Sequence, residues 1–150
     1  MEIKRLTAAD AKLVTELFDQ YRVFYKQSSD QKLAEKFIKE RLEKNESIIF
    51  VALIENIPAG FTQLYPTYSS VRAVKNWILN DLFVKENFRK QGVGEELIRT
   101  AMNFAASEGA TFIQLETAKD NFNAQSLYES IGFTKQLPEY EFFSYKILFK

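Results

Sequence analysis

The segment 80–102 constrains the fold most, because it joins three patterns in an order that few local structures satisfy. Its first residues, NDLFV, are typical of a strand, and a helix expected to start near Gly92 carries Leu97, Ala101 and Phe104 at helical spacing. Between them lies KENFRKQGVG, a basic turn with two glycines. The segment therefore predicts a strand, a turn and a helix that together form a crossover unit.

The remaining patterns predict one mixed α+β domain over residues 1–150. A length of 150 residues with 46% hydrophobic content suits one compact domain with an ample core. Strands are expected at 2–6, in two arms around a hairpin turn at 55–58, and at 77–84, 111–116 and 141–150. Helices are expected at 7–24, 30–42, 92–108 and 121–131, the first two with polar caps at 7–10 and 28–30. Pro66 is expected to bend the second arm of the hairpin.

The composition excludes several chemistries, because the chain has no Cys and no His. Disulfides, thiolate nucleophiles, Cys-based zinc sites and imidazole bases are impossible, so catalysis must use carboxylates, Tyr, Lys, Ser, Thr or backbone groups. No metal is expected, since no EF-hand-like spacing of carboxylates is present. Twenty basic residues balance twenty acidic ones without a basic face, which argues against a nucleic-acid partner. Without an apolar run of about 18 residues, no membrane partner is expected, and a cytoplasmic location is predicted.

The turn RKQGVG has the features of an anion site. Backbone N–H groups at a helix start are unpaired and lie at the positive end of the helix dipole. Gly92 and Gly94 would let the backbone approach a ligand, and Arg89 and Lys90 add positive charge, so a pyrophosphate would fit. An ordinary loop that needs two glycines to turn from strand to helix explains the same residues equally well.

A dinucleotide-binding domain is one alternative, since Glu116 lies about 20 residues after the glycines, where a ribose-binding acid would stand. However, Leu97 occupies the third glycine position of that motif, and seven residues, 85–91, separate the strand from the first glycine. A Walker A loop is also absent, because no Gly-Lys-Ser/Thr follows.

The turn resembles the R-x-x-G-x-G/A signature of the GNAT superfamily of N-acetyltransferases, which bind the pyrophosphate of coenzyme A there. A second segment, LETAKDNFNAQSLYESIGF at 115–133, is similar to a later GNAT segment, and the order of elements agrees over nearly the whole chain. The resemblance implies the GNAT fold: a central twisted, mostly antiparallel sheet with a splayed parallel pair, flanked by about four helices. It implies acetyl-CoA as the co-substrate. The implied coenzyme A contacts are Leu82, Phe83, Val84, Arg89, Lys90, Gln91, Gly92, Val93, Gly94, Glu95 and Asn121.

Within the superfamily, FTQLYPTYSS followed by WILNDLFV is similar to the diamine acetyltransferase branch, which acetylates polyamines and related amines. That branch commonly has Glu-Asp where this chain has Asn80-Asp81. Asp81 alone remains to match the acidic pair.

The resemblance implies direct transfer of an acetyl group to a primary amine in a ternary complex, without an acyl-enzyme. Tyr128 matches the family's acid, which protonates the departing thiolate, and a packed core aromatic is its structural alternative. Glu116 is the first candidate for the base, and Asp81 is the second, either acting directly or through water. An ion pair at a strand end and a hydrogen bond at a strand bulge are their structural alternatives. Asn121 could cap a helix as well as contact coenzyme A.

The acceptor pocket is expected at the junction of the first two helices, in YRVFYKQSSD at 21–30. Its candidate lining residues are Tyr25, Tyr65, Tyr68, Trp77 and Asn80. Aromatic walls suit an ammonium group, although some of these rings must belong to the core. The expected partner is a small-molecule amine or a peptide, and the apolar closing strand would allow a homodimer. A non-catalytic acyl-CoA sensor or a partner-binding module is the alternative function.

Overall fold

The structure is a computed structural model that describes residues 1–138 and 142–149. It contains two compact units, Met1–Glu116 and Thr117–Lys150, and each is considered by itself. The expectation of a single domain over 1–150 stays a prediction.

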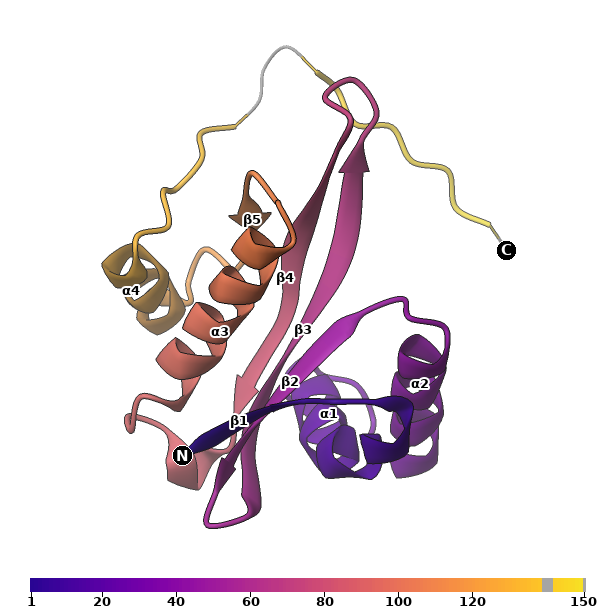
Figure 1. Cartoon of the computed structure of the whole chain (residues 1–150), viewed down its shortest axis with the longest axis vertical. Helices are drawn as coiled ribbons and strands as arrows, with labels where there is room; N and C mark the ends of the chain where they lie inside the picture. Colours follow the sequence, from indigo (N-terminus) through magenta and orange to yellow (C-terminus); the bar gives the residue numbers. More distant parts are fainter. Residues whose placement is uncertain (139–141, 150) are drawn as a thin grey trace. The chain divides into compact units, whose positions relative to one another are not determined.

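The first unit is built on a mixed sheet of five strands in the order β1-β2-β3-β4-β5 (Figure 1). The strands are β1 (Glu2–Arg5), β2 (Ile48–Ile54), β3 (Ile57–Ser69), β4 (Val74–Val84) and β5 (Ile113–Gln114). The first four pair in antiparallel fashion, whereas β5 runs parallel to β4. The prediction of a mostly antiparallel sheet with one parallel pair is confirmed.

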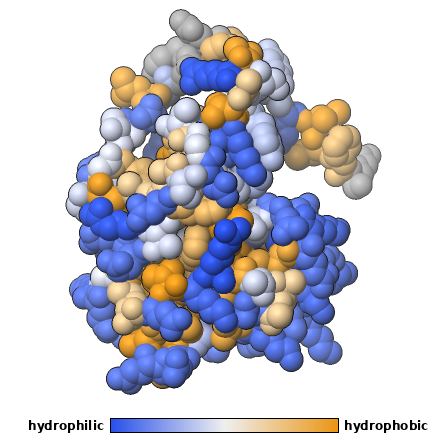
Figure 2. All heavy atoms as spheres, in the orientation of Figure 1, coloured by the Kyte–Doolittle hydropathy of each residue, from blue (hydrophilic) through white to orange (hydrophobic). Residues whose placement is uncertain are grey.

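Helices cover both faces of this sheet. The helices α1 (Lys12–Phe24) and α2 (Gln31–Glu43) lie on one face and α3 (Val93–Ser107) on the other (Figure 1). The core under α1 and α2 includes Val14, Leu17, Ile38, Val51 and Phe61, all at most 1% exposed. The outer face of α2 is hydrophilic (Figure 2), as expected for a helix that buries only one side.

Polar caps set where the first two helices begin. The carboxylate of Asp10 accepts hydrogen bonds from the backbone N–H and the hydroxyl of Thr7 (2.8 and 2.9 Å) around a short 3₁₀ turn, η1 (Ala8–Asp10), before α1. The side chain of Asp30 accepts from the N–H of Leu33 (3.0 Å) and caps α2. Both predicted caps are confirmed, although the first turn is 3₁₀ rather than α.

The hairpin of β3 and β4 contains a bulge. Gln63 pairs with Asp81 and Leu64 pairs with Leu79, so Asn80 is an extra residue on β4. The strand β3 runs through Pro66 without a break, and the bend expected there stays a prediction. A proline is tolerated in a strand where its missing N–H is not needed by the ladder.

The pairing of β4 with β5 is short. Only Trp77 with Ile113 and Ile78 with Gln114 are in register, and β4 continues to Val84 without a β5 partner among the described residues. The predicted strand 111–116 is therefore formed only at its centre. Among the described residues, the pairing of β4 with β5 ends at Ile78, which agrees with the expected splayed pair.

A buried amide fixes the entry of the chain into β5. The side-chain oxygen Oδ1 of Asn76, 1% exposed, accepts from the N–H and the hydroxyl of Thr111 (2.7 and 3.1 Å) and from the N–H of Phe112 (3.2 Å). These bonds connect β4 to the residues just before β5. The start of the splay is thus anchored by a side chain that the sequence patterns did not single out.

The second unit contains α4 (Phe122–Ile131), which Asn121 caps by accepting from the N–H of Ala124 (3.3 Å). The closing strand predicted over 141–150 is not formed at 142–149, because none of these residues pairs with another strand. Val, Ile, Phe and Tyr favour strands only where a neighbouring strand is available. Positions 141 and 150 of that prediction lie outside the described residues.

Candidate active site

The end of β4 and the turn after it place an open strand edge beside a helix start. After Val84 the chain passes through η2 (Glu86–Phe88) and enters α3 at Val93. The N–H of Lys85 donates to the carbonyl of Ala59 (2.9 Å), which holds the start of the turn against β3. The unpaired edge of β4 and the first turn of α3 therefore belong to one continuous stretch of chain.

The first turn of α3 offers backbone donors. Gly92, the residue before the helix, has φ +82°, a left-handed conformation that favours glycine, and within the described part of the chain no side chain caps the helix. The N–H of Glu96 is the first to bond back, to the carbonyl of Gly92 (3.1 Å). The N–H groups of Val93, Gly94 and Glu95 lie in the preceding turn, where a helix has no internal acceptor.

The basic residues of the turn have different environments. The Nε of Arg89 donates to the carbonyl of Val84 (2.9 Å), and its guanidinium lies 5.7 Å from the ring centre of Phe83. Lys90 is exposed and has φ +61°. The carboxylate of Glu95 is paired with Arg99 (2.9 Å), which reduces its repulsion of an anion at the helix start.

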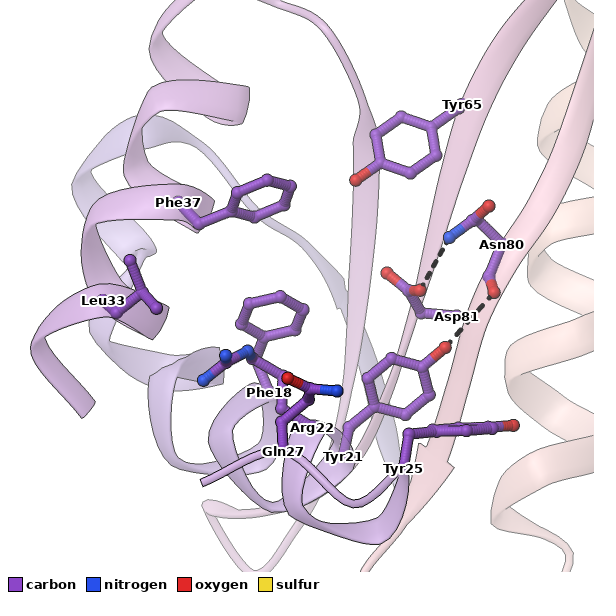
Figure 3. Close-up of a pocket in the computed structure, with 10 residues that line it drawn as sticks. All are labelled: Phe18, Tyr21, Arg22, Tyr25, Gln27, Leu33, Phe37, Tyr65, Asn80 and Asp81. Carbon is purple, nitrogen blue, oxygen red and sulfur yellow. Dashed lines mark hydrogen bonds between the residues drawn. The ribbon is translucent and has the colours of Figure 1, made fainter. Parts of the chain in front are cut away.

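A second feature of the first unit is a cavity of about 480 Å³ between α1, α2, β3 and β4 (Figure 3). It is lined by Phe18, Tyr21, Arg22, Tyr25, Gln27, Leu33, Phe37, Tyr65, Asn80 and Asp81. Five of these ten side chains are aromatic, and only Arg22 and Asp81 carry a formal charge. The cavity therefore combines apolar walls with a few polar groups, as small-molecule sites do.

Asp81 supplies the negative charge of this cavity and is only 4% exposed. Its carboxylate accepts from the amides of Gln63 and Asn80, the latter at 2.9 Å. Gln63, fully buried, in turn accepts from the hydroxyl of Ser47 (2.7 Å). The carboxylate thus sits at the end of a buried chain of neutral donors, with no cation within ion-pairing distance among the described residues.

Burial raises the pKa of the Asp81 carboxyl group above its usual value, and hydrogen bonds from Gln63, Asn80 and Tyr21 offset this only in part. The single hydroxyl proton of Tyr21 is shared with the backbone carbonyl of Asn80, which lies 3.5 Å from the hydroxyl oxygen. The pKa of the Tyr21 hydroxyl is raised, first by burial and then by the charge of Asp81. The same two causes raise the pKa of Tyr65 to about 12, so both phenols stay protonated and can act as donors.

The bulge at Asn80 decides which side chains of β4 reach this cavity. Trp77 packs on Phe104 of α3 (ring centres 5.0 Å apart), whereas Phe83 packs on Tyr21 of α1 (6.4 Å). An uninterrupted strand would put residues 77, 81 and 83 on one face, since side chains alternate. Because Asn80 is inserted, Asp81 faces α1 and α2 instead.

The structure brings some of the predicted acceptor residues together and leaves others apart. Tyr25, Tyr65 and Asn80 line the cavity with Asp81. Trp77 does not line it, because it is buried against α3 on the opposite face of the sheet. Tyr68 is 69% exposed near the end of β3 and is not part of the lining either.

Of the other candidate catalytic groups, Glu116 belongs to the first unit but does not line this cavity, and Tyr128 belongs to the second unit. Glu116 is exposed and follows β5 by two residues, so it lies beyond the strand end rather than on it. Tyr128 is half-buried on α4, with its ring 6.0 Å from that of Phe133. Asn121 is the N-cap of that helix, which is the structural alternative that the sequence offered for this residue.

Several residues of the cavity carry signals too weak to be found in the sequence. Tyr21 and Arg22 are consecutive residues of an amphipathic helix, where an aromatic and a basic side chain are ordinary. Gln63 of β3, which donates to Asp81, forms a buried polar pair with Ser47, the residue before β2, and a fully buried Gln in a strand is the one unusual feature. Their partnership depends on strand pairing, which the linear sequence does not display.

Comparison with known proteins agrees with this geometry. The sequence pattern of the Acetyltransferase (GNAT) family matches residues 11–133, most of the chain. The chain belongs to the GNAT acetyltransferase family. The uncharacterized N-acetyltransferase YhfO of Bacillus subtilis (strain 168) is 45% identical to this acetyltransferase over 133 residues, and the match covers 89% of each chain. This family membership makes the dinucleotide-binding alternative unnecessary.

Two solved structures support the fold of this acetyltransferase. The crystal structure of a probable acetyltransferase has a TM-score of 0.90 at 37% identity and covers 100% of this chain and 99% of its own. The aminoglycoside N-acetyltransferase AAC(6')-Iy in complex with CoA has a TM-score of 0.80 at 18% identity, with 97% and 93% covered, which shows a shared fold. Within residues 1–138 and 142–149, no helix is long and apolar enough to cross a membrane.

Proposed function

We propose that this acetyltransferase moves the acetyl group of acetyl-CoA directly to a primary amine held in the cavity at Asp81. The observation that carries the proposal is the adjacency of Asp81 to Leu82, Phe83 and Val84 on β4. The buried carboxylate faces the cavity, and the three residues after it form the unpaired strand edge. An amine bound at the carboxylate therefore lies beside the backbone proposed to hold the thioester.

Coenzyme A fits the turn and the helix start that follow this strand edge. The N–H groups of Val93, Gly94 and Glu95 point out of the first turn of α3, and Arg89 and Lys90 add positive charge. When bound, acetyl-CoA supplies an activated thioester carbonyl. The chain's own contribution there is to bind the pyrophosphate and to orient the carbonyl with backbone groups of β4.

The amine must lose a proton before it can react. A lysine-like amine has a pKa near 10.4, so its deprotonation at pH 7 costs about 4.6 kcal/mol. Asp81 is suited to accept that proton, directly or through water, because its own pKa is raised by burial. Glu116, the first candidate from the sequence, becomes the second here, because it is exposed beyond the end of β5 and does not line the cavity. Tyr128 is proposed as the acid that protonates the departing thiolate.

Three further proposals concern the molecule as a whole. The alternative function is a sensor that binds an acyl-CoA without turnover, or a partner-binding module. A homodimer and a cytoplasmic location remain proposals. The apolar side chains at 142–149, which include Phe143 (84% exposed) and Tyr145 (91%), are the observation that favours a homodimer.

The proposal is tested by measuring thiol release from acetyl-CoA with a panel of primary amines. We expect amine-dependent release that falls by about a hundredfold or more in Tyr128→Phe and in Asp81→Asn, because each removes a proton-transfer group. Glu116→Gln tests the other candidate base in the same assay. Tyr68→Phe, which changes an exposed tyrosine outside the cavity, is the matched control for Tyr128→Phe.

Calorimetry of coenzyme A binding separates the possible failures. Binding without turnover on any amine would favour the sensor. No binding at all would contradict the assignment of the turn at 89–94 to coenzyme A. Unchanged activity in Tyr128→Phe would exclude that residue as the acid.

A further inference from the structure

The cavity that holds Asp81 has a second charged side chain, Arg22, and the two come from different walls. Asp81 lies on β4 and Arg22 lies in the last turn of α1. Figure 3 shows the guanidinium of Arg22 on the side toward α2, while the carboxylate of Asp81 lies on the sheet side. The cavity is therefore negative on one side and positive on the other.

Arg22 has no carboxylate partner within the parts of the chain that the structure describes. Among the described residues, its one hydrogen bond runs from Nη1 to the backbone carbonyl of Ser28, at 3.4 Å. By contrast, Arg41 is paired with Glu40 and Glu46 (3.3 and 3.2 Å), and Arg99 is paired with Glu95. A half-buried guanidinium without an anion keeps most of its donors available.

The carboxylate nearest to Arg22 in the helix is already engaged elsewhere. Asp19, three residues earlier, is 4% exposed and accepts from the hydroxyl of Ser29 (2.6 Å) and from the N–H of Asp30 (2.8 Å). The carboxylate of Asp19 is therefore hydrogen-bonded to the loop before α2. The positive charge of Arg22 is therefore not neutralised from within its own helix.

The surface between the two charged groups is apolar. The rings of Phe18 and Phe37 are stacked with centres 5.6 Å apart, and Leu33 also lines the cavity. Such a surface suits a methylene chain rather than a second charged group. The order of chemical groups across the cavity is thus anion, apolar wall, cation.

We infer that the acceptor is a small primary amine that carries a carboxylate at its other end, in the manner of an ω-amino acid. The inference rests on the proposed function. Asp81 and the aromatic rings bind the ammonium end, Phe18 and Phe37 contact the chain, and Arg22 binds the carboxylate through paired N–H donors. A diamine would place its second cation against Arg22.

Arg22 also has a structural explanation, since a cation in the last turn of a helix is favourable and its bond to Ser28 ties the following loop. That explanation predicts a loss of stability in Arg22 variants but no change in the ranking of acceptors. The selectivity between acceptors is therefore the decisive readout.

The test compares three amines of equal chain length: δ-aminovalerate, pentylamine and cadaverine. We expect kcat/KM for δ-aminovalerate to exceed the values for the other two about tenfold or more, as a charge-assisted hydrogen bond would give. Other lengths from β-alanine to ε-aminocaproate, each with its alkylamine, locate the best fit. Calorimetric binding of the same amines to the protein loaded with coenzyme A gives a second readout that does not depend on turnover.

Arg22→Gln should lower kcat/KM for the preferred amino acid roughly ten- to a hundredfold, mainly through KM, and Arg22→Lys should restore part of the loss. Lys32→Gln removes the same charge from an exposed position of α2 outside the cavity. It should change neither kcat/KM nor KM for the preferred amino acid. Equal values for the three amines, a preference for cadaverine, or a preference that survives in Arg22→Gln would each overturn the inference. Those results leave acetyl transfer intact, whereas failure of the proposed function shows as no thiol release with any amine and no coenzyme A binding.

Discussion

Asp81 combines a proposed role as a base with burial that disfavours its ionised form. Asp81 is 4% exposed, and the groups that donate to its carboxylate are neutral: the amides of Gln63 and Asn80 and the hydroxyl of Tyr21. Neutral donors offset only part of the free energy lost when an ionised carboxylate leaves water. The folded protein therefore holds the proton of Asp81 more tightly than an unfolded chain does, which suits a base that must work near neutral pH.

Asp81→Asn should make the protein's stability depend less on pH. Because the pKa of Asp81 is raised in the folded state, the folded state binds more protons than the unfolded one above the ordinary pKa of 3.8, and the free energy of unfolding falls as pH rises through that window. The variant lacks this loss. Its stability relative to the native protein should therefore increase from about pH 4 to pH 7, as measured by urea unfolding across that range. Parallel pH curves for the two proteins would contradict the raised pKa.

The start of α3 is the element on which coenzyme A binding depends. Gly92 adopts φ +82° immediately before the helix, and a Cβ at that position would meet no atom within 4 Å. Gly92 directly precedes the free N–H groups of α3, so a side chain added there would stand next to them. Gly109, just after the other end of the helix, has φ +81° and equally open surroundings. The two glycines share a left-handed backbone conformation, but only Gly92 lies at the N-terminal end of α3, where the free N–H groups are.

Gly92→Ala and Gly109→Ala should each lower the free energy of unfolding by about 1–2 kcal/mol, because both force alanine into the left-handed region. Only Gly92→Ala should weaken coenzyme A binding, by about tenfold, which corresponds to roughly 1.4 kcal/mol. Chemical unfolding measures the first effect and calorimetry the second. Equal loss of affinity in the two variants would show that helix stability, rather than access to the N–H groups, controls binding.

At the scale of the whole molecule, the buried core belongs to the first unit. Every fully buried apolar side chain among the described residues lies between Leu6 and Ala105. The helix α4 has no buried residue, and the described part of 142–149 carries several apolar side chains more than 70% exposed. The second unit therefore contributes little to stability by apolar burial of its own. A ligand that binds only the folded protein is expected to raise its free energy of unfolding.

Coenzyme A at about a hundred times its dissociation constant should raise the free energy of unfolding by about 2.7 kcal/mol. For a protein of this size that corresponds to an increase in Tm of about 5–10 °C. Differential scanning fluorimetry with increasing coenzyme A measures the shift, and adenosine, which lacks the pyrophosphate, is the control. A shift that is equally large with adenosine would contradict pyrophosphate binding at α3.

Much of the fold could be predicted because its signals are local. The caps at Thr7 and Asp30, the turn with Gly92 and the helix after it each depend on residues within one or two turns of chain. The family assignment followed from such segments, and the pattern match over residues 11–133 bears it out. The closing strand failed for the opposite reason, since a strand needs a partner that local propensity does not provide.

The cavity was decided by tertiary structure. The bulge at Asn80 turns Asp81 toward α1 and leaves Trp77 against α3, and it arises from the register between two strands. Arg22 and Asp81 are 59 positions apart and meet only because α1 packs on the same face of the sheet. By itself the sequence determined the local elements, the family and the residue types available for chemistry. Strand register and helix packing, which depend on contacts between distant segments, decided which of those residues share a site.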